Sequence, residues 1–364
     1  MATTKVTTDV IDMSGNTGGL TWVKGTTAQR TTTIIGDLRE NTETNRAEIY
    51  TDQTGSSAWR NLKEEAADHS FSVSYLVIAG GGGGSRYGGG GAGGYRNSYA
   101  SEASGGNSTT ESVLSLQPST AYTITVGTGG TGGNRSAGSA GGDSIFSTIT
   151  ADGGGEGIQW PNTSTQSTQN GGSGGGIGSG AGSNTTGTTV ATSDGKTQGT
   201  NAGASGYGVG LYYYGAGGGG AGAAGSSSTQ SGAGNPGAGG NGLSSSITGT
   251  STPRGGGGGG ANGGQSTPKG TGGTGGGGEG TAWNGGDVAN GTEGSPNTGG
   301  GGGAGMNGGS GIVILRSTKA TATLGSGITV NSTAGPGSVN GVAIGGTSDY
   351  YYEATLGSGT ITFS

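Results

Sequence analysis

The chain has 364 residues, of which 98 are glycine and none is cysteine, and its formal net charge is −6. Only 27% of the residues are apolar, so stability must come largely from backbone hydrogen bonds or from other subunits rather than from a conventional core of this length. The absence of cysteine excludes disulfides, thiolate metal sites and cysteine nucleophiles. The acidic balance and the lack of a basic patch argue against nucleic acid as a partner.

The sequence also bears on the compartment. No apolar run approaches the roughly 20 residues that span a bilayer, which argues against membrane insertion. The first residues, MATTKVTTDV, contain no apolar segment of the kind found in secretory signals. We therefore expect an extracellular role to follow cell lysis or export by another route.

Changes of composition divide the chain into residues 1–70, 71–317 and 318–364. The first part has ordinary composition and short strand candidates at residues 21–23, 32–35 and 48–50, separated by Gly, Asn and Thr turns. Residues 60–69, RNLKEEAADH, form either a short helix or a charged connector.

The second part, residues 71–317, contains most of the glycine. It begins with the apolar run YLVIA at residues 75–79 and ends with GIVILR at residues 311–316, and both runs are typical of buried strands. Interior segments at residues 121–126 and 144–150 alternate like strands. Between these strands lie glycine blocks at residues 80–84, 88–91, 217–220, 255–260, 275–278 and 299–303.

Such blocks have two interpretations. A flexible Gly/Ser linker is the first, because glycine loses the most backbone entropy on folding and buries no side chain. The second is an ordered bundle of extended helices with three residues per turn, which bond laterally because no Cβ intervenes. The length of the region and its bracketing strands favour the bundle. An interior helix needs glycine at all three positions, as in block 255–260, whereas the interrupted segment 127–133 suits an outer helix with one free face.

The segments between the blocks would be loops of this bundle, and loops commonly carry binding residues. They contain Trp160, Tyr207, Tyr212, Tyr213, Tyr214 and Trp283. Aromatic side chains among Asn, Ser and Thr provide flat apolar faces and hydrogen-bonding groups suited to a carbohydrate or to protein loops. These residues are our candidate receptor-binding set. The alternative is that Trp160 and the three consecutive tyrosines pack against the bundle as a small apolar cluster.

The third part, residues 318–364, contains five short strand candidates at residues 321–324, 327–330, 339–344, 349–355 and 359–363. A β unit of this size is too small to be stable alone, so we expect it to pack on the glycine region or on neighbouring subunits.

Several of these motifs resemble parts of bacteriophage tail fibres. GDLRENT at residues 36–42, AEIY at 47–50 and SAWRNL at 57–62 resemble a module in which an LRxNT hairpin precedes an E-I-Y strand and an exposed W-x-x-L. The strand ending VIAGGGGG, the segments SLQPSTAYTITVGTGG and GGDSIFSTITADGGG, and the closing GGSGIVILR resemble the glycine-rich domain of phage fibres and tail-tip adhesins. The ending YYYEATLGSGTITFS resembles the closing strands of phage fibre proteins.

This resemblance implies a mainly β protein with almost no α-helix, in which strands form a scaffold and the glycine blocks form a polyglycine II helix bundle. It implies a virion tail fibre, a homotrimer, joined to the tail or to an adaptor protein through residues 1–70. Loops between glycine blocks would attach the particle to a bacterial surface glycan or outer-membrane protein. No cofactor is expected.

Catalytic patterns are weak. His69 is the single imidazole, so a Ser-His-Asp triad would depend on it. Carboxylates for a polysaccharide depolymerase are available, but no spacing selects a pair; they are Asp143, Asp152, Glu156, Glu279, Asp287 and Glu293. We expect no enzyme activity and no metal site. Two alternatives stay open, a self-assembling extracellular filament or surface-layer protein without a receptor, and a depolymerase spike.

Overall fold

The fold was analysed in a computed structural model. It describes residues 23–29, 38–43, 46–52, 57–61, 70–159, 172–178, 207–209, 212–229, 235–263, 268–282 and 290–364. The chain divides into two compact units, Met1–His69 and Ser70–Ser364. The expected strand at residues 32–35 and most of the expected helix or connector at 60–69 lie outside the described residues. Among the described residues, no helix is long and apolar enough to cross a membrane.

The first unit contains a four-stranded sheet and one 3-10 turn at Thr27–Gln29. Its strands are β1 (Val23–Gly25), β2 (Leu38–Asn41), β3 (Arg46–Asp52) and β4 (Ser57–Asn61). β1 runs parallel to β2, and the other pairs are antiparallel.

The motif residues of this unit form a buried polar cluster. Arg39, Asn41 and Glu48 are at most 4% exposed, and Asn41 Nδ2 donates to Glu48 Oε1 at 2.9 Å. Trp59 is half-buried; its ring centroid lies 5.6 Å from that of Tyr50, and the Arg39 guanidinium is 5.6 Å from the Trp59 ring. Tyr50 and Arg39 thus cover part of the Trp59 ring.

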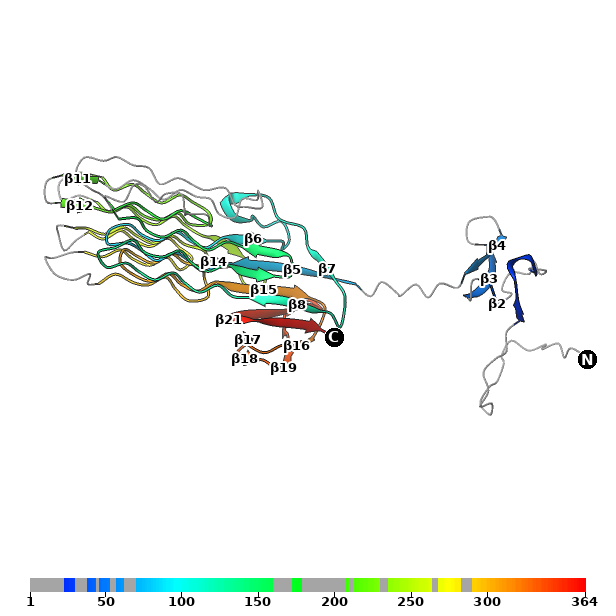
Figure 1. The fold of residues 1–364 in the computed structure, drawn as a ribbon. Helices are drawn as coiled ribbons and strands as arrows, with labels where there is room; N and C mark the ends of the chain where they lie inside the picture. Colours follow the sequence, from blue (N-terminus) through cyan, green and yellow to red (C-terminus); the bar gives the residue numbers. More distant parts are fainter. Residues whose placement is uncertain are drawn as a thin grey trace, which may run out of the picture. The chain divides into compact units, whose positions relative to one another are not determined.

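The second unit is built on a larger sheet with the central order β10-β9-β8-β21-β15-β5-β6 (Figure 1). The seven strands in this order are β5 (Phe71–Ile78), β6 (Tyr95–Asn97), β8 (Ala121–Thr125), β9 (Ser144–Phe146), β10 (Ile149–Ala151), β15 (Ile312–Ser317) and β21 (Tyr350–Phe363). Off this path lie β7 (Leu114–Leu116), β16 (Thr321–Leu324), β17 (Ile328–Val330), β18 (Thr333–Ala334), β19 (Gly337–Asn340) and β20 (Val342–Ala343). Two further hairpins are β11–β12 (Tyr207–Val209 and Tyr212–Tyr214) and β13–β14 (Leu243–Ser245 and Thr252–Arg254), and residues Gly105–Asn107 form a 3-10 turn.

The two central strands are buried on both faces, which explains their unbroken apolar sequences. Val77 of β5 and Val313 of β15 belong to the cluster that also contains Phe146, Ile361 and Phe363. Ile78 and Ile314 belong to the cluster on the opposite face. The strands expected at residues 75–79 and 311–316 are confirmed.

The end of the chain is one long strand rather than the two expected at residues 349–355 and 359–363. β21 pairs first with β15, through Val313 and Ala354, and then with β8, through Thr125 and Ser358. The strand continues past Gly357, whose φ of 90° bends the backbone without breaking the pairing. Its pairing with β17 shifts register between Thr329 and Val330, as at a β-bulge. The C-terminal strands therefore complete the same sheet as β5 and β15.

Extended glycine segments continue directly from the strands and run side by side away from the sheet (Figure 1). In segment 79–85, successive amides donate in turn to three neighbouring segments, and every third amide returns to the same neighbour. Ala79 donates to Gly94 and Gly82 to Gly91; Gly80 donates to Gly142 and Gly83 to Ser139. Gly81 donates to Gly309 and Gly84 to Met306. A period of three residues is that of a polyproline II-type helix. The carbonyls of the same segment accept hydrogen bonds from three further segments. The donors are the amides of Gly154 and Gly157 in the first, Gly130 and Gly133 in the second, and Gly302 and Gly305 in the third. This helix thus has six bonded neighbours.

Among the described residues, three other segments also bond to six neighbours each; they are residues 88–94, 255–261 and 299–304. Apart from Ala92, Ala261 and Ala304, these three segments contain only glycine. Glycine is required because a Cβ on Gly81 would lie on the carbonyl oxygen of Gly300, and one on Gly258 on that of Gly302. The prediction that contiguous blocks occupy the interior is confirmed for blocks 80–84, 88–91, 255–260 and 299–303. It was wrong for block 275–278, because Gly275 and Gly276 lie in a turn, each with a φ of 96°.

Segment 127–133 is an outer helix, also as predicted. It bonds to three neighbours: its amides donate to Gly81 and Gly84, and its carbonyls accept from two antiparallel segments around residues 139–142 and 308–311. Its glycines at 127, 130 and 133 are buried, while Thr128 and Thr131 are exposed. Side chains are therefore carried only on the face that has no neighbouring helix.

Candidate functional site

The glycine helices alternate in direction along the chain, so about half of the connections between them lie at the end of the bundle opposite the sheet. Three of these turns are described in full, at residues 85–88, 133–137 and 304–306. Backbone bonds connect this end of the bundle, among them Ala261 N to Tyr87 O at 2.7 Å and Gly84 N to Met306 O at 2.9 Å. β11 and β12 lie at the same end (Figure 1). We call this surface the distal end.

A stack of side chains covers part of the distal end. The rings of Tyr87 and Tyr213 are stacked with centroids 5.6 Å apart and an angle of 22° between their planes. The guanidinium carbon of Arg86 lies 5.0 Å from the Tyr87 ring centroid, a cation–π geometry. Ala261 and Ala304, the alanines that end two inner helices, pack beneath these rings. The inner helices thus end in a small apolar platform.

The two tyrosines of the stack differ in exposure. Tyr87 is 6% exposed, and burial raises the pKa of its hydroxyl, although the nearby charge of Arg86 acts in the opposite direction. Tyr213 is half-buried, so it is more accessible to solvent than Tyr87. A flat aromatic face supported from below by a second ring is suited to stacking on an apolar or sugar surface.

The six sequence-predicted residues fall in different places. Tyr213 is at the stack, and Tyr214 is 4% exposed, with its carbonyl accepting from Ser228 Oγ at 3.0 Å. In the β11–β12 hairpin Tyr207 pairs with Tyr214, while Tyr212 pairs with Val209; the side chains of Tyr207 and Tyr212 are outside the described set. Trp160 and Trp283 also lie outside the described residues, although they follow Gln159 and Ala282 of described segments. The packing interpretation thus fits Tyr214, whereas Tyr213 is only half-buried.

Arg86 and Tyr87 were not among the residues predicted from the sequence. Both lie among the three residues, Ser85 to Tyr87, that separate the glycine blocks 80–84 and 88–91. A charged and an aromatic residue that interrupt two inner blocks are a signal for a turn at the bundle end, and this signal was available from the sequence.

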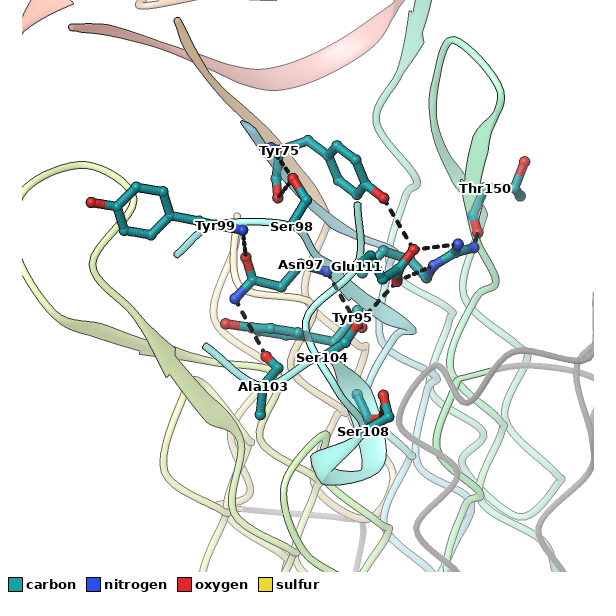
Figure 2. A network of polar contacts seen from close by, with 12 residues as sticks. Tyr75, Tyr95, Asn97, Ser98, Tyr99, Ala103, Ser104, Ser108, Glu111 and Thr150 are labelled. Carbon is teal, nitrogen blue, oxygen red and sulfur yellow. Dashed lines mark hydrogen bonds and ion pairs between the residues drawn. The ribbon is translucent and has the colours of Figure 1, made fainter. Parts of the chain in front are cut away.

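A second polar constellation lies at the other end of the bundle, near the sheet (Figure 2). Arg96 Nη2 donates to Glu111 Oε2 at 2.6 Å, and Arg96 Nη1 donates to the carbonyl of Thr150 at 2.9 Å. The same carboxylate accepts from Tyr75 OH at 3.0 Å and from Ser104 Oγ at 3.1 Å. Burial would raise the pKa of Glu111, but the hydrogen bonds and charge of Arg96 hold that pKa below its ordinary value.

This network fixes the long connection between β6 and β7. Glu102 in the same connection accepts from the amide and hydroxyl of Ser246, and Asn107 Nδ2 donates to the carbonyl of Gly222 at 2.7 Å. The connection therefore holds together β5, the β13–β14 hairpin and a turn between glycine helices. A hollow of about 490 Å³ beside it is lined by Tyr75, Ile149 and residues 108–114. Each polar group of Glu111 and Arg96 described above has a protein partner, so we assign this constellation to stability.

Within the described ranges, no group of three or more His, Asp or Glu side chains is close enough to hold a metal ion. Of the carboxylates considered for glycosidase chemistry, Asp143 Oδ1 accepts from the amide of Gly153 at 2.8 Å and Glu293 Oε1 accepts from Asn307 Nδ2 at 2.9 Å. Burial raises the pKa of Glu156. These bonds fix loops of the bundle. Asp287 and His69 lie outside the described residues.

The fold and the distal end define a class of protein in which a β-sheet scaffold supports a polyglycine II helix bundle with loops gathered at one end. The chain belongs to the glycine-rich domain family, whose match covers residues 61–318. No curated protein and no solved structure matches the chain significantly.

Proposed function

We propose that this protein is a bacteriophage tail fibre or tail-tip adhesin, and that its distal end attaches the particle to a bacterial surface glycan or outer-membrane protein. In this proposal residues 1–70 join the tail or an adaptor, and the chain functions as a homotrimer in the virion. The supporting observation is the separation of two roles in the second unit: backbone bonds between glycine helices provide the scaffold, and the distal end carries side chains such as Arg86, Tyr87 and Tyr213.

This separation suits an attachment protein. The inner helices contribute almost no side chains, so changes in the distal turns leave the lateral hydrogen bonds intact. Tyr213 is a half-buried aromatic residue stacked on Tyr87 at that end. Trp160, Tyr207, Tyr212 and Trp283 belong to the same proposed binding set by their place in the sequence. Several copies per particle would raise the avidity of weak single sites.

The test uses the purified full chain, fluorescently labelled, and a panel of whole bacterial cells that includes strains with truncated lipopolysaccharide. We expect saturable binding to a subset of strains. Tyr213→Ala and Trp283→Ala should each weaken binding by about tenfold, the loss of roughly 1.4 kcal/mol of contact energy. Ser251→Ala is the matched control, because Ser251 is exposed in the β13–β14 turn at the sheet end.

Three results would contradict the proposal. The first is binding to no strain, and the second is binding that the distal variants leave unchanged while they remain folded. The third is assembly of the purified chain into filaments of indefinite length, which would favour the surface-layer alternative. Loss of capsule polymer on incubation with the protein would indicate the depolymerase instead.

A further inference from the structure

Five Asn–Gly steps lie in the described part of the chain, and they provide a comparison within one molecule. They are Asn241–Gly242, Asn262–Gly263, Asn290–Gly291, Asn307–Gly308 and Asn340–Gly341. At such a step the glycine amide nitrogen can attack the asparagine side-chain carbon, because glycine has no Cβ to obstruct the approach. The attack requires an amide that is not held in a hydrogen bond.

In four of the five steps the glycine amide is held. Gly308 N donates to Gly130 O at 2.8 Å and Gly263 N donates to Tyr213 O at 2.6 Å, both in the bundle. Gly242 N donates to Thr274 O at 2.8 Å and Gly341 N donates to Ala320 O at 2.9 Å. Asn307 is fixed at its side chain as well, since Oδ1 accepts from Gly132 N and Nδ2 donates to Glu293.

The fifth step, Asn290–Gly291, is different. Asn290 is exposed, with a φ of 77°, and Gly291 N–H donates to no described residue. Lys269 Nζ donates to the backbone carbonyl of Asn290, the oxygen of the peptide bond that contains the Gly291 nitrogen. When that nitrogen loses its proton, the negative charge is shared with this oxygen, so the ammonium group stabilises the attacking form.

From these contacts we propose that Asn290–Gly291 is a self-modification site at the distal end, activated by Lys269. The deprotonated nitrogen of Gly291 bonds to Cγ of Asn290, and the carboxamide C–N bond breaks. The leaving nitrogen takes a proton and departs as ammonia, which produces a five-membered succinimide. Water then adds across one of the two ring C–N bonds and opens the ring, giving aspartate or isoaspartate. No oxidant or cofactor takes part.

The modification changes the surface in two ways. Either product adds one negative charge beside Lys269, and the isoaspartyl product also lengthens the backbone by one carbon. Asn290 lies two residues before Thr292, whose amide donates to the carbonyl of Glu279 at 3.0 Å near the end of the bundle. The distal surface of an aged chain would therefore differ in charge from that of a fresh chain. This inference stands independently of the proposed attachment role.

The experiment follows asparagine conversion by site-resolved peptide mass spectrometry during incubation of the folded chain in mildly alkaline buffer. Trypsin releases residues 270–316 as one peptide, which contains both Asn290 and the matched control Asn307. We expect Asn290 to convert at least about tenfold faster than Asn307 in the folded chain, because the Gly308 amide must first open. In denaturant the two rates should become similar.

The activation by Lys269 is tested with Lys269→Met and Lys269→Arg, on chains whose melting temperature is unchanged. The methionine variant should slow conversion at Asn290 several-fold, while the arginine variant keeps a cation and should retain most of the rate. Equal rates at Asn290 and Asn307 in the folded chain would overturn the site. A rate at Asn290 that Lys269→Met leaves unchanged would overturn the role of the lysine.

Discussion

The amide of Gly82 donates to the carbonyl of Gly91 at 2.9 Å, across two antiparallel glycine helices. The carbonyl of Gly82 in turn accepts from the amide of Gly302 at 2.9 Å, in a third helix. One residue without a side chain thus joins three helices. Because the same arrangement recurs along the inner helices, the bundle resembles a sheet extended in two lateral directions, and its stability depends on close approach of backbones.

Substitution of Gly82 by alanine should destabilise the second unit strongly. The new Cβ would lie on the carbonyl oxygen of Gly155, which is itself bonded to Gly91 N at 2.8 Å. Neither helix can move without breaking further bonds, so we expect a loss of about 3 kcal/mol or more in unfolding free energy. Thermal and denaturant unfolding measure this loss. Gly345→Ala is the control, because no atom lies within 4 Å of a Cβ placed there, and equal melting temperatures for the two variants would refute the packing argument.

Amide hydrogen exchange should separate inner from outer positions. The amides of Gly82 and Gly258 are bonded within buried helices, so they should open only with the whole unit. The amide of Thr128, on the outer helix, donates to no described residue and should exchange about a thousandfold faster or more. Mass spectrometry with overlapping peptides resolves the two groups. Uniformly fast exchange in the glycine blocks would mean that the bundle does not persist in solution.

Glu111 should make the protein sensitive to acid. Its pKa is lowered in the folded state despite burial, chiefly by hydrogen bonds from Arg96 and by the charge of that residue. The stabilisation is therefore present above the ordinary pKa of 4.5 and is lost as the pH falls through the lower, folded-state value. Denaturant unfolding at several pH values below 5 should show this loss.

Glu111→Gln tests the same ion pair at neutral pH. The variant leaves Arg96, which is 2% exposed, without its charge partner. We expect a loss of about 3 kcal/mol at pH 7 and a flatter dependence on pH below 5. Glu40→Gln is the control, because Glu40 pairs with the exposed Lys24. A Glu111→Gln variant as stable as the control would contradict the role of the network.

Tyr352 should limit stability at high pH. Burial is the main cause that raises the pKa of its hydroxyl to about 12, and this hydroxyl donates to the carbonyl of Lys319 at 2.9 Å. Because the folded-state pKa lies above the unfolded value of 10.0, the stabilisation is complete below pH 10 and is lost between pH 10 and 12. Tyr352→Phe should cost about 1 kcal/mol at pH 7 and reduce the slope of stability in that window. An unchanged slope would show that another group controls the alkaline transition.

Much of the bundle was predictable because close packing of its helices restricts which residue type fits at each single position. A helix with neighbours on all sides excludes Cβ atoms, and this exclusion is visible in the sequence as the contiguous block at residues 255–260. Thr128 and Thr131 marked an outer helix for the same reason. The apolar runs that became β5 and β15 were equally clear, since burial on both faces leaves no polar position.

Other features depended on long-range contacts that no local pattern encodes. Residues 356–358 were expected to separate two strands, whereas pairing with both β15 and β8 keeps β21 continuous through them. The bond between Arg96 and Glu111 joins a strand end to a loop 15 residues away with no periodic signal. At the distal end, Tyr213 of β12 and Tyr87 of the turn at residues 85–88 are far apart in sequence, so their stacking could not be predicted from either segment.

The period of three in the amide bonds has a consequence for how this family can vary in length. Adding three residues to a glycine helix lengthens it by one turn, about 9 Å, and leaves every amide facing the same neighbour. Adding one or two residues rotates each later amide toward a different helix and breaks the pairing of the whole lattice. Insertions and deletions in the helices should therefore come in multiples of three, while the distal turns can accept any length.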